Sequence, residues 1–237
     1  MQTDEHIEYL SSQLQLIVSQ EHTFGTDALL LASFSAPKRR EKAVDLGTGC
    51  GIIPFYWIRE GLEEKCFGVD IQERAIDQLK RSVELNGLEQ RLSPVLCDLR
   101  AMSGHFPAGS FDLVTMNPPY KPLGSGIISE LQNEKIARHE TMCTLEDITA
   151  CASRLLRFGG RLCMCLRPER LCDAVTAMRE ARLEPKRLRF VAQRSGCRPW
   201  LVLIEGKRGA KPHLTVMEEL YIESDETEKI VGAYRKK

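Results

Sequence analysis

Val44-Asp45-Leu46-Gly47-Thr48-Gly49-Cys50-Gly51 is the stretch of this sequence that decides its fold. An apolar run typical of a buried strand leads directly into a glycine-rich turn, and a helix is predicted at Ile52–Glu60. Glycines in such a turn let the backbone approach a ligand closely, and the amides that open the helix face that ligand. The stretch therefore predicts a strand, a turn and a helix with a ligand site where the strand ends.

The rest of the chain repeats this alternation. Strands are predicted at Ala43–Leu46, Cys66–Asp70, Leu92–Cys97, Phe111–Met116, Arg161–Leu166, Arg187–Ala192 and Leu201–Glu205. Further helices are predicted at Glu73–Leu85, Leu145–Arg157 and Pro168–Arg182, with Gly159-Gly160 as a helix stop. Strands separated by helices form a doubly wound sheet, so we expect an α/β fold with a seven-stranded, mostly parallel sheet. The helix-free connection at residues 193–200 predicts a terminal antiparallel hairpin.

We expect three regions along the chain. Residues 1–41 form an N-terminal extension covering the site, residues 42–210 the main domain, and residues 211–237 a C-terminal tail. In the extension, residues 14–18 alternate like a short strand, and a helix begins near Thr26. Thr26 or Asp27 either caps that helix or acts on a ligand.

Composition places the chain among soluble globular proteins. Its 237 residues are 43% hydrophobic and 28% charged, with a formal net charge of zero. No apolar run approaches the roughly 20 residues of a membrane span, and the N-terminus lacks the features of a signal peptide. The nine cysteines are scattered without a C-x-x-C pair, so no metal or disulfide site is predicted. We therefore expect a cytoplasmic protein that does not enter a membrane.

Basic residues are concentrated in the C-terminal half. Between Arg154 and Lys211 the sequence holds 15 lysines or arginines and 5 acidic residues. Such an excess is typical of a surface that faces phosphates, including Lys186, Arg187, Arg189, Arg194 and Arg198. Helix faces that are rich in arginine for other reasons remain the alternative.

Acidic residues stand at three successive strand ends. Asp45 lies just before the glycine turn, Asp70 ends the second strand, and Asp98 follows the third. Asp70 is placed to bind the two hydroxyls of a ribose, and Asp98 to accept from an adenine amino group. The dinucleotide fingerprint requires glycine where this chain has Ile52, which argues against NAD. Each acid alone is also compatible with an ordinary strand end, but the set indicates one nucleoside site.

The tetrapeptide Asn117-Pro118-Pro119-Tyr120 follows the fourth strand. Two prolines fix their own φ and donate no hydrogen bond, and the first restricts Asn117 to extended geometry. The loop thus presents one amide, bare carbonyls and one aromatic face, which suits a flat group bearing an NH2. A proline-rich turn with a solvated asparagine is the alternative.

Together these motifs resemble the class I S-adenosylmethionine-dependent methyltransferases, whose fold is Rossmann-like. Residues 45–51 resemble the first motif of that family, and residues 117–120 match the signature of its amino-methylating branch. Residues 24–32, 136–147 and 167–171 are similar to segments of the tRNA1(Val) adenine-37 N6-methyltransferase family. Lys121 departs from that family, in which an aromatic often follows the signature.

The resemblance implies S-adenosylmethionine as the cofactor, tRNA as the partner and no metal. It implies catalytic roles for Asn117, Pro118 and Tyr120, in which Asn117 Oδ1 and the Pro118 carbonyl accept from the target NH2 and Tyr120 stacks on the base. Implied cofactor residues are Thr26, Asp45, Gly47, Gly49, Asp70, Ile71, Asp98, Leu99 and Asn117. Substrate residues are expected at Tyr120, at Arg138 and His139, which either line the substrate entry or form a helix surface pair, and at Arg194 and Arg198 of the basic stretch.

The expected reaction is methyl transfer to N6 of adenine in tRNA, with adenine 37 of tRNA1(Val) as the target. Methylation of guanine N2 in ribosomal RNA or of a protein glutamine remains open, because both present a planar NH2. A binding module that kept the fold without catalysis is a further alternative. The oligomeric state cannot be predicted from the sequence.

Overall fold

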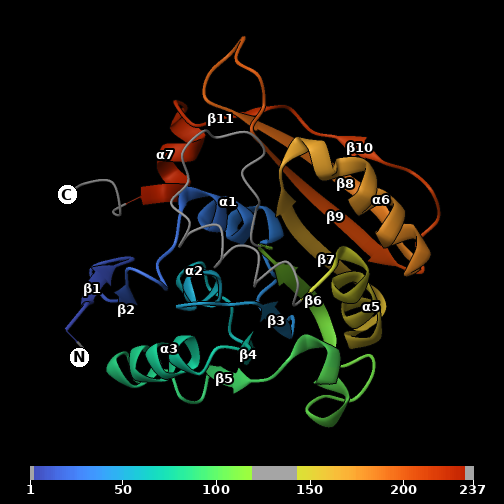
Figure 1. Ribbon diagram of the computed structural model, residues 1–237. Coiled ribbons are helices and arrows are strands. Elements are labelled where there is room, and N and C mark those ends of the chain that lie inside the picture. Colours follow the sequence, from blue (N-terminus) through green and yellow to red (C-terminus); the bar gives the residue numbers. More distant parts are fainter. Residues whose placement is uncertain (1–2, 119–142, 233–237) are drawn as a thin grey trace, which may run out of the picture.

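The computed structural model describes residues 3–118 and 143–232, and its centre is one large, mostly parallel β-sheet (Figure 1). Over those residues the sheet has nine strands in the order β10-β8-β9-β7-β6-β3-β4-β5, and β11 also pairs with β8. The strands are β3 (Ala43–Leu46), β4 (Cys66–Asp70), β5 (Leu92–Leu96), β6 (Phe111–Met116), β7 (Leu156–Leu166), β8 (Leu183–Ala192), β9 (Leu201–Arg208), β10 (Thr215–Val216) and β11 (Leu220–Tyr221). All seven predicted strands are present, which confirms the α/β fold.

Helices cover both faces of this sheet (Figure 1). One apolar core joins the sheet to α1 (Thr26–Ser35), α2 (Ile52–Arg59), α3 (Glu73–Leu85) and α7 (Asp225–Val231). A second core joins the other face to α5 (Leu145–Leu155), α6 (Leu171–Glu180) and the 3-10 turn η1 (Leu99–Gly104), and a second such turn, η2 (Pro168–Arg170), precedes α6. Successive strand residues alternate between the two cores, as pleated strands require. The sheet is therefore doubly wound, as predicted.

The hairpin at the end of the sheet is also confirmed. β9 runs antiparallel to both β7 and β8, whereas β3, β4, β5, β6 and β7 pair in parallel. β10 and β11 then extend the sheet beyond β8. Residues 215–231, which fall in the predicted tail, thus contribute two strands and a helix. The three-region division of the chain stays a prediction.

One predicted helix end was wrong. α5 ends at Leu155, and Gly159-Gly160 lies inside β7 rather than stopping the helix. The β6–β7 register shifts between Phe111 and Leu113, and a Cβ on Gly160 would meet the carbonyl oxygens of Arg157 at 3.0 Å and Phe111 at 3.1 Å. The glycine therefore permits a close backbone approach at an irregular point of the sheet.

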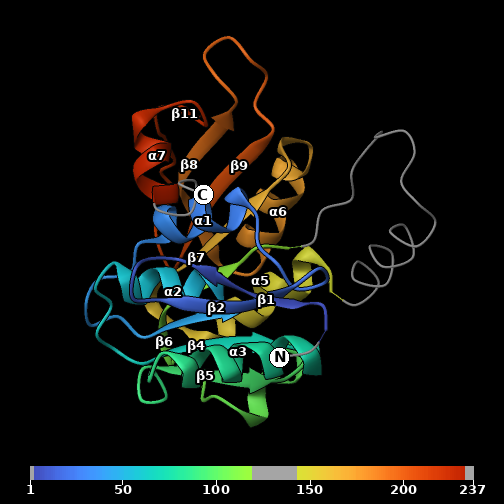
Figure 2. The same cartoon turned by 90° about the vertical axis from the view of Figure 1, so that its left-hand side faces the viewer.

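The N-terminal strands β1 (Glu5–Tyr9) and β2 (Gln15–Ser19) form a separate two-stranded sheet that lies across the α2–α3 side of the molecule (Figure 2). The fully buried Glu5 carboxylate accepts from the Arg81 guanidinium of α3 at 2.7 and 2.8 Å. The backbone N–H of Ile17 donates to Ser82 Oγ at 2.9 Å. These contacts fix the hairpin on α3 just before the chain reaches the site. Within the described ranges, no helix combines the length and hydropathy that a membrane span requires.

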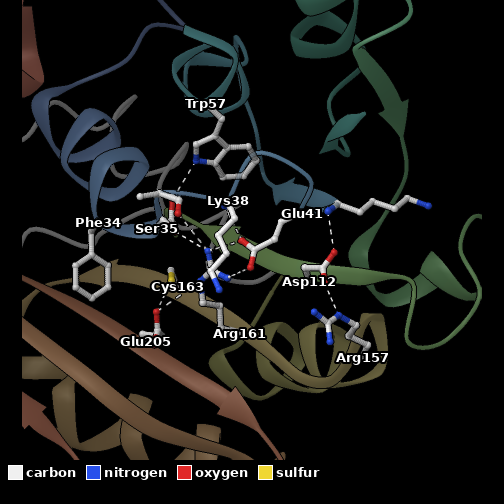
Figure 3. Close-up of polar contacts among 12 residues, drawn as sticks. Phe34, Ser35, Lys38, Glu41, Trp57, Asp112, Arg157, Arg161, Cys163 and Glu205 are labelled. Carbon is white, nitrogen blue, oxygen red and sulfur yellow. Dashed lines mark hydrogen bonds and ion pairs between the residues drawn. The ribbon is translucent and has the colours of Figure 1, made fainter. Parts of the chain in front are cut away.

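The C-terminal end of α1 is held against the sheet by two arginines, and Figure 3 shows the first of them, Arg161, beside Ser35 and Glu41. Arg161 of β7 donates to the Ser35 carbonyl at 3.0 Å and pairs with Glu41 at 2.8 Å. Arg187 of β8 pairs with Glu205 of β9 at 2.6 Å and donates to the last turn of α1 as well. Cations at a helix C-terminus satisfy its free carbonyls and interact favourably with its dipole. α1 is therefore tied to three strands at this end.

Arg161→Ala should lower the free energy of unfolding by about 3 kcal/mol, because removing one partner leaves a buried carboxylate uncompensated. That carboxylate is Glu41, whose side chain is only 13% exposed, whereas Glu205 keeps its ion pair with Arg187. Urea denaturation measures it. Arg179→Ala removes an ion pair whose arginine is 61% exposed and should change stability by less than about 0.5 kcal/mol. Equal effects of the two substitutions would contradict the anchoring role.

Candidate active site

A cavity of about 380 Å³ lies where β3, β4, β5 and β6 end. Residues 21–25 and the first turn of α1 form one wall, so part of the N-terminal region does border it. Of the residues predicted to bind the cofactor, all but one line this cavity: Asp45, Gly47, Gly49, Asp70, Ile71, Asp98, Leu99 and Asn117. Thr26 does not, although Gly25 and Asp27 on either side of it do. The structure thus brings the predicted residues together, and their individual roles stay predictions.

The glycine turn adopts a backbone that other residues rarely take. Gly47, Gly49 and Gly51 have φ of +64°, +55° and +87°. A Cβ on Gly51 would meet Leu79 of α3 at 2.3 Å, so this glycine lets the turn pack on the helix. A Cβ on Gly49 would meet no protein atom within 4 Å. Gly49 therefore leaves open space at the cavity wall, which a bound ligand can use.

Asp70 is held by the backbone of its neighbours. Its side chain accepts from the Gly49 N–H at 2.9 Å and from the Gln72 N–H at 3.0 Å, and the residue is 5% exposed. Each carboxylate oxygen has a second lone pair, so two donors leave acceptor capacity. An acceptor oriented in this way at a cavity wall suits a pair of ribose hydroxyls.

Asp98 has a different environment. It caps η1 by accepting from the Arg100 N–H at 2.9 Å, and it pairs with the Arg100 guanidinium at 2.5 Å. These hydrogen bonds and the cation hold the pKa of Asp98 below its usual range. Asp98 is consequently charged at neutral pH, and the half-buried Leu99 beside it provides an apolar surface for a base.

Asp45 is buried inside β3, and the Thr115 hydroxyl donates to its Oδ1 at 2.7 Å. Burial raises the pKa of Asp45 to about 7, and the nearby charge of Asp70 adds to that shift while the threonine opposes it. A carboxyl with a pKa near neutrality changes its charge in the range where most enzymes work.

Asn117 follows β6 at the same edge, and its amide is held at both ends. Its Nδ2 donates to Asp27 Oδ2 at 2.9 Å, and the thiol of Cys165 donates to its Oδ1 with an S–O distance of 3.0 Å. The half-buried Pro118 comes next. The predicted residues Tyr120, Arg138 and His139 lie outside the described residues.

Sequence reasoning missed the two partners of Asn117. The expected side-chain cap of α1 was wrong, because Gly25 is the N-cap, no side chain caps the helix, and Asp27 contacts Asn117 instead. Cys165 is a fully buried core residue whose thiol also reaches Asn117. Parallel pairing of Met116 with Met164 places Cys165 next to Asn117, so knowledge of the β6–β7 register would have found it.

The basic stretch divides into two groups. Arg187 of β8 forms an ion pair with Glu205 of β9, and Arg189 of β8 forms one with Glu226 of α7. Arg194 and Arg198 lie in the connection between β8 and β9, which projects from the body of the molecule (Figures 1 and 2). Both are exposed, and neither pairs with a residue that the structure describes. Because β9 begins where β7 ends, this connection stands at the same sheet edge as Asn117.

Residues 17–181 match the methyltransferase small domain family. The chain belongs to that family. It is 27% identical to a tRNA1(Val) (adenine(37)-N6)-methyltransferase of Tolumonas auensis, over 83% of this chain and 80% of that protein. A Yersinia pseudotuberculosis protein of the same name is 26% identical over 60% of this chain and 56% of its own length. These similarities confirm the resemblance that the motifs predicted.

Solved structures agree on the fold. A predicted O-methyltransferase from Agrobacterium tumefaciens superposes with a TM-score of 0.71 at 21% identity, over 86% of this chain and 95% of that one. A SAM-dependent methyltransferase from Methanosarcina mazei gives 0.53 at 15% identity, over 76% and 97% of the two chains. The family match, the fold and the open turn at Gly49 identify S-adenosylmethionine as the cofactor of this methyltransferase.

The affinity for S-adenosylmethionine should rise between pH 6 and pH 8. The cofactor carries a sulfonium and an ammonium against one carboxylate, and this net positive charge favours an ionised Asp45, whose pKa is about 7 in the free protein. As the pH rises through that value the carboxyl ionises before binding, so the dissociation constant should fall roughly tenfold over the two units. Below pH 7, binding should release a proton.

Isothermal titration at several pH values, in buffers of different ionisation enthalpy, measures both effects. Asp45→Asn is the matched control, because its amide does not titrate and should abolish the proton release and the pH dependence together. A wild-type affinity that does not change over this range would contradict the assigned ionisation of Asp45.

Proposed function

We propose that this enzyme methylates the exocyclic N6 of adenine in tRNA, with adenine 37 of tRNA1(Val) as its target. The observation that carries the proposal is the Asn117 amide, held by Asp27 and Cys165 at the wall of the cofactor cavity. The names of the similar Tolumonas and Yersinia proteins support the choice of acceptor.

Asn117 and Pro118 supply the catalytic contacts in this proposal. The lone pair of an exocyclic amino nitrogen is conjugated into the ring, so the nitrogen is a poor nucleophile. Asn117 Oδ1 and the Pro118 carbonyl accept its two N–H groups, and these hydrogen bonds strengthen as the nitrogen becomes pyramidal and cationic. Stronger contacts in the transition state than in the ground state lower the barrier.

The cofactor supplies an electrophilic methyl group on a sulfonium. The amino nitrogen of the acceptor forms the new N–C bond as the C–S bond breaks, and the product nitrogen then loses a proton to water. No residue is needed to remove that proton before the transfer. Holding the two reactants in line contributes up to about 7–11 kcal/mol.

An unpaired tRNA loop suits the site better than a duplex does. The target base must leave its stack to enter the cavity, and a loop base is already partly unstacked. Arg194 and Arg198 stand at the same edge and provide, for the phosphates, guanidinium groups that form no ion pair within residues 3–118 and 143–232. Stacking by Tyr120 and entry contacts by Arg138 and His139 complete the proposed acceptor site.

The decisive experiment is incubation with methyl-labelled cofactor and unmodified tRNA transcripts, followed by nucleoside analysis. We expect label in N6-methyladenosine of one tRNA species. Asn117→Ala should lower the turnover roughly 100- to 1000-fold, as loss of one transition-state hydrogen bond does elsewhere, and should change the cofactor dissociation constant less than about threefold. Label in N2-methylguanosine or only in protein would overturn the proposed acceptor, and near-normal turnover of Asn117→Ala would overturn the mechanism.

Arg194→Ala combined with Arg198→Ala should raise the KM for tRNA and reduce its salt dependence. Loss of two phosphate contacts lowers the slope of log affinity against log salt by about one to two. Filter binding at several salt concentrations measures this slope. Arg179→Ala comes from the same basic stretch but lies at the end of α6, near the start of β8 and hence at the opposite sheet edge, so it should leave the slope unchanged. An equal effect of Arg179→Ala would mean that the whole stretch acts as one diffuse charge.

A further inference from the structure

We propose that Asp27 is a positioning residue, which fixes the end of the Asn117 amide that faces the methyl acceptor. This inference rests on the proposed methyl transfer to an amino nitrogen. Asp27 comes from the first turn of α1, and Asn117 follows β6, 90 residues later in the chain. Their side chains meet in a hydrogen bond of 2.9 Å at the wall of the cofactor cavity.

The chemistry of the two groups determines the orientation of the amide. A carboxylate accepts hydrogen bonds and donates none, so Asn117 must turn its NH2 toward Asp27. The amide oxygen then faces the other way, where it accepts from the Cys165 thiol at 3.0 Å. A carbonyl oxygen has two lone pairs, so one thiol donor does not use the whole acceptor capacity of Oδ1.

This orientation selects the class of acceptor. An outward oxygen binds a group that donates hydrogen bonds, such as the NH2 of adenine. A flipped amide would present its own NH2 and favour a carbonyl or a ring nitrogen in that place. A site that presents an acceptor binds a donor group and rejects a substrate that offers only another acceptor, because that pairing leaves buried polar atoms without a hydrogen bond. Asp27 thereby makes an otherwise ambiguous amide specific for amino groups.

The surroundings of Asp27 hold its carboxylate in place. A Cβ on Gly25 would lie 2.5 Å from Asp27 Oδ1, so the absence of a side chain at residue 25 leaves the space that the carboxylate occupies. At its other end α1 is tied to the sheet through Arg161 and Arg187. α1 is therefore fixed at its C-terminal end by the two arginines, and its first turn holds Asp27 against the Asn117 amide.

A direct contact between Asp27 and the cofactor is the competing role, because Asp27 also lines the cavity. The two roles differ in what they predict for cofactor affinity. A ligand of the cofactor ammonium would weaken binding when removed. A residue that acts through Asn117 would lower the rate of methyl transfer and leave that affinity almost unchanged.

Asp27→Ala should lower the single-turnover rate on unmodified tRNA by about 10- to 100-fold and change the cofactor dissociation constant less than about threefold. Asp27→Asn keeps an acceptor oxygen in the same place and should recover part of the rate. In an Asn117→Ala background, Asp27→Ala should cause no further loss, because both residues act through one amide. Ser33→Ala, on the same helix, is the control and should match the wild type.

A cofactor dissociation constant raised tenfold or more by Asp27→Ala would overturn the positioning role, and so would losses that multiply in the double variant. A second readout needs no substrate: in ¹⁵N spectra the side-chain NH2 resonances of Asn117 should move on Asp27→Ala and stay in place on Ser33→Ala. Unmoved resonances would overturn the inference even if the enzyme methylates adenine. If those resonances move but no amino nitrogen is methylated, the proposed function fails and the orientation of the amide stands.

Discussion

In a parallel sheet all strands end at the same edge, and this site depends on that constraint. Leu46 pairs with both Val69 and Met116, and Asp70 pairs with Leu96, so the ends of β3, β4, β5 and β6 lie side by side. The glycine turn, Asp70, Asp98 and Asn117 follow those strand ends directly. Segments far apart in the sequence thus meet around one cavity without any specialised element.

The carboxylates of the cavity have three different charge environments. Arg100 lowers the pKa of Asp98 and keeps it ionised, and backbone N–H groups donate to Asp70. Burial raises the pKa of Asp45 to about 7. Asp45 and Asp70 are the two buried acids of the set. The charge of Asp70 contributes to the raised pKa of Asp45, so a neutral Asp45 avoids a second buried charge beside it.

α1 connects the N-terminal region with the end of β6. One end is held by Arg161 and Arg187, and the other presents Asp27 to Asn117. The ion pairs at the anchored end are costly to desolvate, and their value lies in the several hydrogen bonds that they make to helix carbonyls and carboxylates. A shift of α1 would move Asp27 and with it the Asn117 amide, so the anchored end of the helix and the cofactor cavity are linked through one helix.

The sequence by itself determined the strands, the glycine turn, the strand-end acids and the family resemblance. Each of these depends on local patterns: apolar runs, glycine at fixed spacing, and acids where a strand stops. Only the tertiary structure shows that Asp27 contacts Asn117 rather than capping α1, and that the thiol of Cys165 contacts the other end of the same amide. The tertiary structure also shows that Arg187 and Arg189 form ion pairs, whereas Arg194 and Arg198 are exposed in the β8–β9 connection. A count of charges along the sequence does not distinguish these two pairs of arginines. The reason is physical, because the partner of a side chain depends on strand register and helix packing, and both are set by contacts between residues distant in the chain.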